Sequence, residues 1–236
     1  MCAGTVNEMS AWKAISGLQI AIDGPSGSGK GTIAKMLAEA VGLPVLDTGL
    51  LYRFIGYCSM QQGADDEAAV LACMDASLGD MQWKPGGIFV NGENIGNRLR
   101  QQDVAAAASR VAAMPGVRSR LLHVQQDIAA NGCVMDGRDI GSVVLPGAQA
   151  KFFLTASLRE RARRRWSQLQ GLGAEASLDA ILNEIRDRDT QDAERTHSPL
   201  QQAGDALSID STTMRIDEVV DRMLSIMERR ELISKA

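Results

Sequence analysis

Short, mostly apolar runs alternate with longer amphipathic segments along most of the chain, which is typical of α/β proteins. Five runs have the length of buried strands: 18–22, 43–46, 133–135, 150–154 and 206–209. Between the first two runs, the apolar residues of 33–41 fall on one face of a helix, and Gly42 is placed to end it. Residues 215–232 show the same helical spacing after the last run. The pattern therefore predicts an α/β core that begins at residue 18.

The alternation breaks between residues 59 and 112, where we expect an inserted lobe. Residues 65–78 have helical spacing, and three short strand-like runs follow in 81–95, around Asn91-Gly92, a pair that favours tight hairpin turns. The chain is thus divided into an N-terminal extension (1–17), a core (18–58 and 113–236) and an insert (59–112). The extension has no periodic pattern and is expected to be poorly ordered or to form one short helix.

The first apolar run leads into a glycine-rich stretch, Asp23-Gly24-Pro25-Ser26-Gly27-Ser28-Gly29-Lys30-Gly31-Thr32, and the helical segment follows it. Glycine tolerates backbone conformations closed to other residues, so successive N–H groups can turn inward on an anion at the helix N-terminus. A lysine at this place in such a loop reaches the β and γ phosphates of a nucleotide. We therefore expect Gly24 to Thr32 to bind nucleotide phosphates, with Lys30 as the mobile cation.

This loop departs from the common pattern at Gly31, because Ser or Thr usually follows the lysine and ligates magnesium. The hydroxyl comes one residue later, at Thr32. Either Thr32 takes part, or Mg²⁺ is held mainly by nucleotide oxygens and water with carboxylates behind them. Asp136, at the end of the third run, is the candidate carboxylate on the metal side. The glycine disfavours GTPases and motor ATPases, whose metal sites use the direct hydroxyl.

The chain has 236 residues, of which 45% are hydrophobic and 23% are charged. Its composition and charge limit the kinds of partner that it can bind. A net charge of -4 gives no support to broad nucleic-acid binding, which normally shows as a basic face. Many of the 19 arginines lie between 159 and 195, and arginine matches phosphate oxygens two at a time. No apolar run approaches the roughly 20 residues that span a bilayer. The four cysteines show no metal-ligand spacing, so we expect reduced thiols, a cytoplasmic protein and no membrane contact.

Two groups of polar residues follow the second and third apolar runs. Asp47-Thr48-Gly49 provides capping side chains for a helix on which Thr48 and Tyr52 lie one turn apart, with Arg53 adjacent. Asp136-Gly137-Arg138-Asp139 follows the third run directly. α/β sheets bind ligands at the carboxyl ends of their strands. The Thr48 hydroxyl, the Tyr52 phenol and the Arg53 guanidinium could therefore hold a second ligand there. An ordinary capped helix with a surface arginine fits the same residues.

An arginine-rich pair of helices is predicted over about 158–195, with Ser157 and Glu160 as a capping box at its start. Farther along, Arg188, Asp192 and Arg195 share one helical face. Such a hairpin could form a lid that closes over transferring phosphates, neutralises their charge and excludes water. A solvated charged surface is the alternative.

These motifs in series resemble the bacterial-type cytidylate kinases, of the nucleoside monophosphate kinase family. The likeness covers everything from residue 18 and rests on the Gly-Lys-Gly-Thr of the loop, Asp47-Thr48-Gly49 with Tyr52-Arg53, Asp136-Gly137-Arg138-Asp139, the 188–195 motif and the insert. Adenylate kinases would instead carry Asp-Gly-Phe-Pro-Arg at position 136. The resemblance implies a five-stranded parallel sheet of order 2-3-1-4-5, an inserted NMP-binding lobe and a short helical lid. It also implies phosphoryl transfer from ATP to CMP or dCMP with Mg²⁺, by a monomer.

The resemblance further implies roles for single residues. Those that would bind the acceptor are Thr48, Tyr52, Arg53, Ser109, Arg118, Arg138, Asp139, Arg188 and Asp192. Arg53 and Arg138 would hold its phosphate, and Ser109, Arg118 and Asp139 would read the cytosine. The catalytic set would be Lys30, Arg138, Arg188 and Arg195. The resemblance does not assign which of the arginines between 161 and 165 join this set. At position 48 the family is expected to carry serine, and Thr48 keeps its hydroxyl.

Two other classes of function compete. One is another small-molecule kinase on the same core, of the uridylate or shikimate type. The other is a non-enzymatic nucleotide switch, or an ATPase that a nucleic acid stimulates. An acceptor panel with ATP separates these possibilities.

Overall fold

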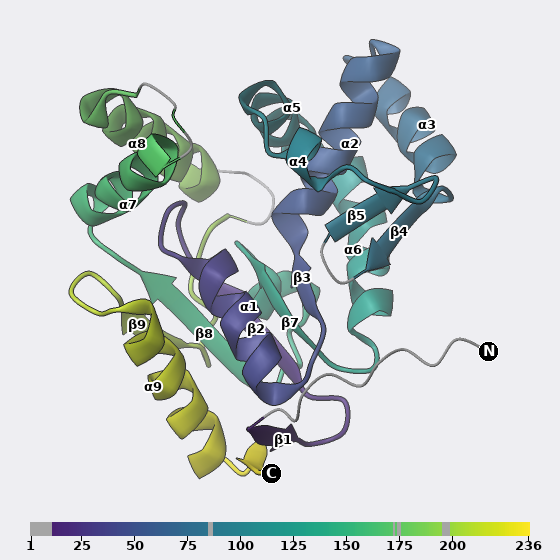
Figure 1. Cartoon of the computed structure of the whole chain (residues 1–236). Helices are drawn as coiled ribbons and strands as arrows, with labels where there is room; N and C mark the ends of the chain where they lie inside the picture. Colours follow the sequence, from purple (N-terminus) through teal and green to yellow (C-terminus); the bar gives the residue numbers. More distant parts are fainter. Residues whose placement is uncertain (1–10, 85–86, 172, 174–175, 195–198) are drawn as a thin grey trace. The chain divides into compact units, whose positions relative to one another are not determined.

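The computed structural model describes residues 11–84, 87–171, 173, 176–194 and 199–236 (Figure 1). The described part of the chain divides into two compact units. Among the described residues, the first comprises those of 11–46, 129–194 and 199–236, and the second comprises those of 47–128. The first unit carries the phosphate loop.

A five-stranded parallel sheet forms the centre of the first unit. Its strands are β2 (Gln19–Asp23), β3 (Val45–Asp47), β7 (Cys133–Gly137), β8 (Ala150–Thr155) and β9 (Leu207–Asp210). The strands lie in the order β3-β7-β2-β8-β9, and the β2–β7, β2–β8 and β8–β9 pairs are parallel. Counted in chain order within this sheet, the order is 2-3-1-4-5. The α/β class and the five-stranded sheet predicted from the sequence are therefore confirmed.

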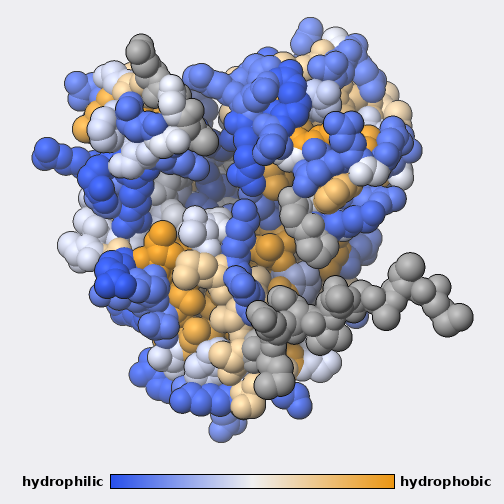
Figure 2. All heavy atoms as spheres, viewed as in Figure 1, coloured by the Kyte–Doolittle hydropathy of each residue, from blue (hydrophilic) through white to orange (hydrophobic). Residues whose placement is uncertain are grey.

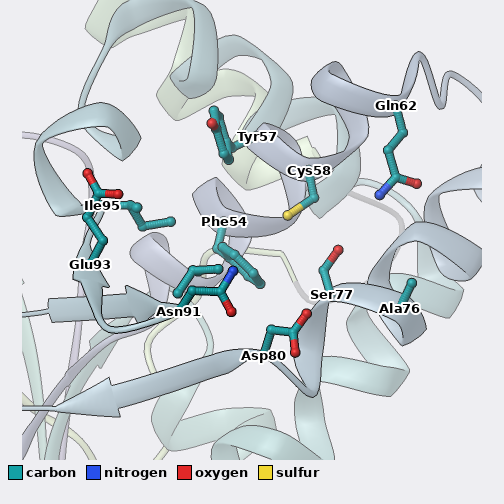
Figure 3. Close-up of a pocket in the computed structure, with 11 residues that line it drawn as sticks. Phe54, Tyr57, Cys58, Gln62, Ala76, Ser77, Asp80, Asn91, Glu93 and Ile95 are labelled. Carbon is teal, nitrogen blue, oxygen red and sulfur yellow. The ribbon is translucent and has the colours of Figure 1, made fainter.

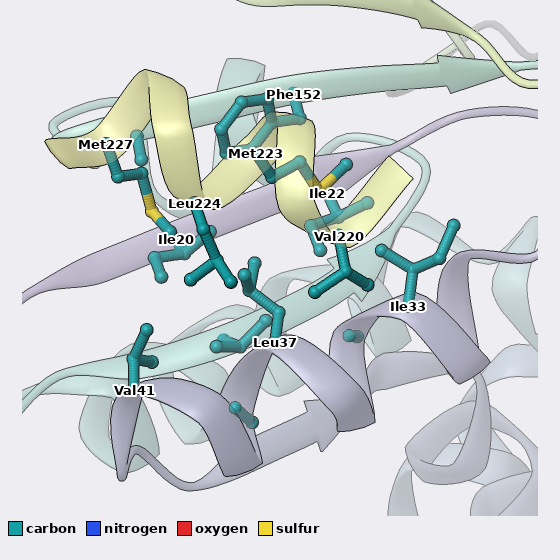
Figure 4. Close-up of a cluster of buried hydrophobic side chains, with 14 of the residues drawn as sticks. Ile20, Ile22, Ile33, Leu37, Val41, Phe152, Val220, Met223, Leu224 and Met227 are labelled. Carbon is teal, nitrogen blue, oxygen red and sulfur yellow. The ribbon is translucent and has the colours of Figure 1, made fainter. Parts of the chain in front are cut away.

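The main hydrophobic core lies between β2 and two helices, α1 (Lys30–Val41) and α9 (Ile216–Arg229), on one face of the sheet. Leu37 of α1 and Leu224 of α9 point toward one another, with Ile20 of β2 beside Leu224 (Figure 4). Each fully buried side chain of this kind contributes roughly 1.5–3 kcal/mol. Gly42 ends α1 in the left-handed conformation, as its position in the sequence indicated. The core fixes β2 and α1, and hence the loop between them.

The two ends of the described chain form a small antiparallel ribbon of β1 (Trp12–Ala14) and β10 (Ile233–Lys235). We expected no strand within 1–17, so that prediction is wrong for residues 12–14. We also expected the last helix to reach residue 232, but it ends at Arg229 and the chain turns at Glu231, with φ of 58°. Three-residue strands carry hardly one period of alternation, so only their pairing reveals them.

The chain after β7 continues through a short π-helix, η1 (Ile140–Val144), which the sequence pattern did not indicate. Beyond β8 come α7 (Leu158–Gly171) and α8 (Leu178–Glu194), which pack together around Ala162, Ile181 and Ile185. The predicted pair of helices is thus present.

The predicted capping box of α7 forms only in part. The Ser157 hydroxyl accepts from the Glu160 N–H at 3.3 Å. However, the Ser157 N–H donates to the Thr212 hydroxyl, and the Glu160 carboxylate binds Arg163 and Arg164 instead. Two guanidinium groups within one turn compete better for the carboxylate than one backbone N–H does.

The second unit consists of helices around a three-stranded meander. Its elements are α2 (Thr48–Gln62), α3 (Glu67–Leu78), β4 (Met81–Lys84), β5 (Gly87–Val90), β6 (Glu93–Asn94), α4 (Gly96–Leu99), α5 (Gln102–Ala112) and most of α6 (Pro115–Ala129). Asn91 and Gly92 both have positive φ, 51° and 84°, so the predicted turn is confirmed. A Cβ on Gly56 would lie 2.7 Å from the Ala108 nitrogen, which shows how closely α2 and α5 approach.

Hydrophilic residues predominate on the face of the molecule seen in Figure 2, and apolar residues gather there in small groups. The large apolar side chains that the described residues expose are Ile15, Met36, Val143, Trp166, Leu178 and Ile216. Each belongs to a different segment. In the described part of the chain, no helix is long and apolar enough to cross a membrane.

Candidate functional site

The phosphate loop joins the end of β2 to the start of α1 in a conformation that needs its glycines. Gly24 has φ of 148°, and a Cβ there would lie 2.0 Å from the Leu154 carbonyl oxygen on β8. Gly29 is left-handed, with φ of 95°, immediately before the first turn of α1. Only glycine fits the first position, and the second directs the chain into the helix N-terminus, where N–H groups and the helix dipole favour an anion.

Lys30 extends back over this loop. Its ammonium donates to the carbonyls of Gly24 at 2.7 Å and Pro25 at 2.8 Å, and the residue is only 6% exposed. Burial, and then the charge of Arg138, lower the pKa of Lys30 well below its ordinary value, while Asp136 and Asp23 oppose that shift. A buried cation that two backbone oxygens hold is well suited to exchange them for phosphate oxygens.

Two buried carboxylates lie at the ends of adjacent strands, Asp23 on β2 and Asp136 on β7. An Oδ2 atom of Asp136 lies 3.9 Å from the place where a Cβ on Gly31 would be. The missing side chain at residue 31 thus leaves the first turn of α1 facing this carboxylate. Oxygen of this kind is what Mg²⁺ prefers, so Asp136 fits the metal side of the site. The Thr32 side chain is exposed on the same turn.

No group of three or more His, Cys, Asp or Glu side chains within the described residues could hold a metal ion by itself. A divalent ion at this site would therefore depend on the phosphates and water for most of its ligands.

Arg138 and Asp192, which are far apart in the sequence, form an ion pair in the first unit. The Arg138 Nε lies 2.7 Å from Asp192 Oδ2, and the Asp192 side chain on α8 is almost fully buried. The charge of Arg188, one turn earlier on α8, also acts on Lys30. The structure therefore gathers Lys30, Arg138, Arg188 and Asp192, all predicted site residues. Arg195, the last of the predicted set on this helical face, lies outside the described residues.

The arginines of α7 divide into two groups, which the sequence alone left open. Arg161 donates to the Ser26 carbonyl at 2.9 Å, and Arg164 donates to the Ser28 carbonyl at 3.3 Å. Arg163, by contrast, is mostly exposed and pairs with Glu160. Arg161 and Arg164 therefore hold the backbone of the phosphate loop, so that its N–H groups keep their direction.

Asp139, also predicted to bind the acceptor, is buried in the first unit immediately before η1. The other predicted residues belong to the second unit. The Asp47 side chain caps α2 by accepting from Leu50 N–H at 3.3 Å, and the buried Thr48 is the first residue of that helix. The guanidinium of Arg118 lies 5.6 Å from the centre of the Tyr52 ring, which is the distance of a cation–π contact. These two predicted residues are thus neighbours.

The other two residues in this unit bond to nearby backbone. Arg53 donates to the Leu99 carbonyl at 2.8 Å, across from α2 to α4. The Ser109 hydroxyl donates to the Ala105 carbonyl at 3.2 Å within α5. Both bonds hold polar side chains in defined directions.

A cavity of about 420 Å³ opens elsewhere in the second unit, between α2, α3 and the meander (Figure 3). Phe54 and Tyr57 contribute aromatic surface to it, and Asp80 and Glu93 contribute carboxylates. The residues that line this cavity do not include any of the predicted site residues. The described residues of its lining include carboxylates and no basic side chain, so it does not suit a phosphate.

Sequence reasoning missed two residues that shape the site, Asp23 and Ser211. In the sequence, Asp23 stands out only as the start of the loop, yet its carboxylate accepts from the N–H groups of Ile140 and Gly141. The Ser211 hydroxyl accepts from Arg164 at 3.0 Å beside the phosphate loop. Both contacts join residues far apart in the chain, so no local pattern signals them.

Comparison with known proteins identifies the family. The cytidylate kinase family profile matches residues 20–229. A cytidylate kinase from Pasteurella multocida (strain Pm70) is 46% identical over 217 residues, covering 89% of this chain and 95% of the relative. A cytidylate kinase from Vibrio cholerae (serotype O1, strain ATCC 39315 / El Tor Inaba N16961) is 44% identical over 216 residues, covering 89% of this chain and 96% of the relative. With the phosphate loop, the parallel sheet and the ion-paired Arg138 in place, the chain belongs to the cytidylate kinase family.

Proposed function

We propose that the protein transfers the γ-phosphoryl group of ATP to CMP or dCMP, giving ADP and CDP or dCDP. The observation that carries this proposal is the grouping of Lys30, Arg138 and Asp192 beside the phosphate loop in a member of the cytidylate kinase family. Lys30 suits the phosphates of the donor, and Arg138 suits the phosphate of the acceptor.

On the donor side, the loop N–H groups from Gly24 to Thr32 hold the phosphates of ATP, and Lys30 follows the γ-phosphoryl group. The Lys30 ammonium leaves the two loop carbonyls as it does so. Asp136 would hold Mg²⁺ on this side of the site, with the Thr32 hydroxyl as the second candidate ligand. When bound, the metal neutralises charge on the transferring phosphates. Arg161 and Arg164 keep the loop in shape.

On the acceptor side, Arg138 shares its guanidinium between Asp192 and the phosphate of CMP, with Arg53 as the second arginine on that phosphate. Tyr52 and Thr48 line the pocket, and Ser109, Arg118 and Asp139 recognise the cytosine. Arg188 and Asp192 approach the sugar, and Arg195 meets phosphate. The Arg118 guanidinium over the Tyr52 ring supports this assignment, because the contact prearranges two of the acceptor residues.

The reaction needs positioning and charge neutralisation more than a strong base. A CMP phosphate oxygen is already an anionic nucleophile at neutral pH, and the transition state is loose. Lys30, Arg138 and Arg188 supply preorganised positive charge for the oxygens of the transferring group, the kind of stabilisation that typically contributes most to catalysis. No side chain has to remove a proton.

Two segments of the chain have separate roles in this reaction. Residues 59–112 serve as the acceptor-binding insert, and about 158–195 serve as a lid over the phosphates. The protein acts as a monomer in the cytoplasm, where its cysteines stay reduced.

A coupled ADP-release assay with ATP and CMP, dCMP, UMP or AMP tests the proposal. We expect turnover with CMP and dCMP to exceed turnover with UMP and AMP. Equal or greater turnover with UMP would make the protein a uridylate-type kinase. Hydrolysis of ATP that RNA or DNA stimulates, without CMP phosphorylation, would make it a nucleic-acid ATPase instead.

Recognition of cytosine is tested at Asp139. Cytosine presents an amino donor at position 4 where uracil presents an acceptor, so a carboxylate there favours cytosine. The Asp139→Asn amide can rotate to donate to uracil, so we expect the kcat/KM ratio of CMP to UMP to fall by roughly five- to a hundredfold. Asp179→Asn, an exposed change on α8, serves as the control. An unchanged ratio would remove Asp139 from base recognition.

A further inference from the structure

Asp23 makes a contact that none of the roles above explains. It is the last residue of β2, next to Gly24 of the phosphate loop, and it is only 4% exposed. One carboxylate oxygen accepts from the Ile140 N–H at 2.8 Å, and the other accepts from the Gly141 N–H at 2.7 Å. Both oxygens are thus committed to one short segment that lies more than a hundred residues away in the chain.

That segment begins directly after Arg138 and Asp139, the two acceptor residues that follow β7. Ile140 and Gly141 start the π-helix η1, which the Asp139 carbonyl also holds by accepting from the Val143 N–H at 2.9 Å. π-helical turns are rare in proteins and are frequently found at functional sites. Asp23 therefore fixes the first turn of η1 and, with it, the backbone of Arg138 and Asp139.

The fit around this contact is tight. A Cβ on Gly141 would lie 3.2 Å from Cδ of Lys151 and 3.4 Å from Oδ2 of Asp23, so residue 141 has little room to move. Burial raises the pKa of Asp23, and the hydrogen bonds from Gly141 and Ile140 oppose that shift, as expected for a carboxylate that the backbone solvates in place of water. The nearby charge of Asp139 adds to the shift, which places the two carboxylates near one another.

We propose that Asp23 is a positioning residue for acceptor recognition, which ties the segment from Arg138 to Gly141 to the first residue of the phosphate loop. The inference rests on the proposed function. The carboxylate holds the acceptor residues in a fixed relation to Lys30, so that the acceptor phosphate lies in line with the γ-phosphoryl group. A misplacement of about 1 Å in such a geometry can cost on the order of a hundredfold in rate.

The test is Asp23→Asn, which keeps the size of the side chain but has one acceptor oxygen, so that its NH₂ faces one of the two N–H donors. We expect kcat/KM for CMP to fall by roughly five- to a hundredfold, and the kcat/KM ratio of CMP to UMP to fall with it. The affinity for ATP, measured by calorimetry without acceptor, should change by less than about threefold, since the loop N–H groups stay in place and Asp136, the carboxylate with the larger charge effect on Lys30, is kept. Asp217→Asn, in an exposed ion pair on α9, is the matched control and should change none of these three quantities.

If Asp23 only stabilises the fold, the same measurements give a different result. If Asp23→Asn weakens ATP and CMP by the same factor and leaves the CMP to UMP ratio unchanged, the positioning role is wrong. Gly141→Ala covers the case in which Asp23→Asn does not fold, because it shifts the same segment by tenths of an ångström and keeps the carboxylate. A folded Gly141→Ala protein with unchanged CMP affinity and ratio would also overturn the inference. Failure of the wild-type protein to phosphorylate CMP is a separate result, which overturns the proposed function instead.

Discussion

Replacing Arg161 with methionine should destabilise the protein strongly, although the arginine lies on a helix rich in exposed charge. Its side chain is only 7% exposed and lies 2.6 Å from Asp189 of α8. It also donates to the carbonyls of Ala156 at 3.0 Å and Ser26 at 2.9 Å. Methionine keeps most of the volume of the stem, so Arg161→Met removes the charge and the donors without opening a large cavity.

The magnitude follows from what the substitution leaves behind. Removing one partner of a buried ion pair typically costs about 3–5 kcal/mol, because the other charge stays buried without compensation. The Asp189 side chain is 23% exposed, so water can reach it in part, and the lower end of that range applies. With a urea slope of about 2 kcal/mol per molar, a loss of about 3 kcal/mol lowers the midpoint of unfolding by about 1.5 M.

Urea unfolding followed by circular dichroism measures this shift, and Arg163→Met on the same helix is the matched control. The Arg163 side chain is 61% exposed in its pair with Glu160, and pairs of that kind contribute about 0–1 kcal/mol. Adding Asp189→Asn to Arg161→Met should restore part of the loss, because the uncompensated charge is gone. If Arg161→Met and Arg163→Met lower the midpoint equally, the buried pair of Arg161 and Asp189 does not carry the stability assigned to it.

Three further predictions concern single groups. Lys30→Met should lower kcat by a hundredfold or more, typical of losing one preorganised charge contact, while circular dichroism stays unchanged; more than about a tenth of wild-type kcat would count against its role. The Arg163 guanidinium, with Arg164 beside it, lowers the pKa of Glu160 from 4.5 to about 2, so this ion pair stabilises the fold above about pH 4.5 and is lost as the pH falls toward 2. Glu160→Gln should therefore flatten the loss of unfolding free energy across that window, and parallel curves would refute this. Burial raises the pKa of Cys133 to about 12, and the other described thiols are buried as well. In a Cys2→Ser protein at pH 8, these thiols should therefore react with a disulfide reagent on the order of a hundredfold more slowly in the native state than in the unfolded state.

The sequence was most informative where the signal is local. The five core strands carry apolar runs because helices or loops cover both faces of a parallel sheet, so their burial shows directly in composition. The phosphate loop was evident because its glycines and Lys30 lie together in one short stretch of the sequence. The turn at Asn91-Gly92 is similarly local, and both residues have the positive φ that this dipeptide favours.

What the sequence did not reveal depends on partners that are distant in the chain. The β1–β10 ribbon pairs residue 12 with residue 235, and neither strand has enough alternation to be recognised alone. The tie from Asp23 to η1 is invisible for the same reason. Within the α7 arginine run, spacing alone could not separate Arg161 from Arg163, because their difference lies in burial against the phosphate loop rather than in local pattern.

The most direct test of the account follows the fate of the transferred phosphoryl group. The protein is mixed with ATP labelled in its γ-phosphate and with CMP, UMP and AMP at equal concentrations, and the labelled products are separated by chromatography. The account predicts that the label appears chiefly in CDP, and that Lys30→Met protein forms almost none. Label that accumulates in inorganic phosphate, or in UDP or ADP in preference to CDP, would contradict it.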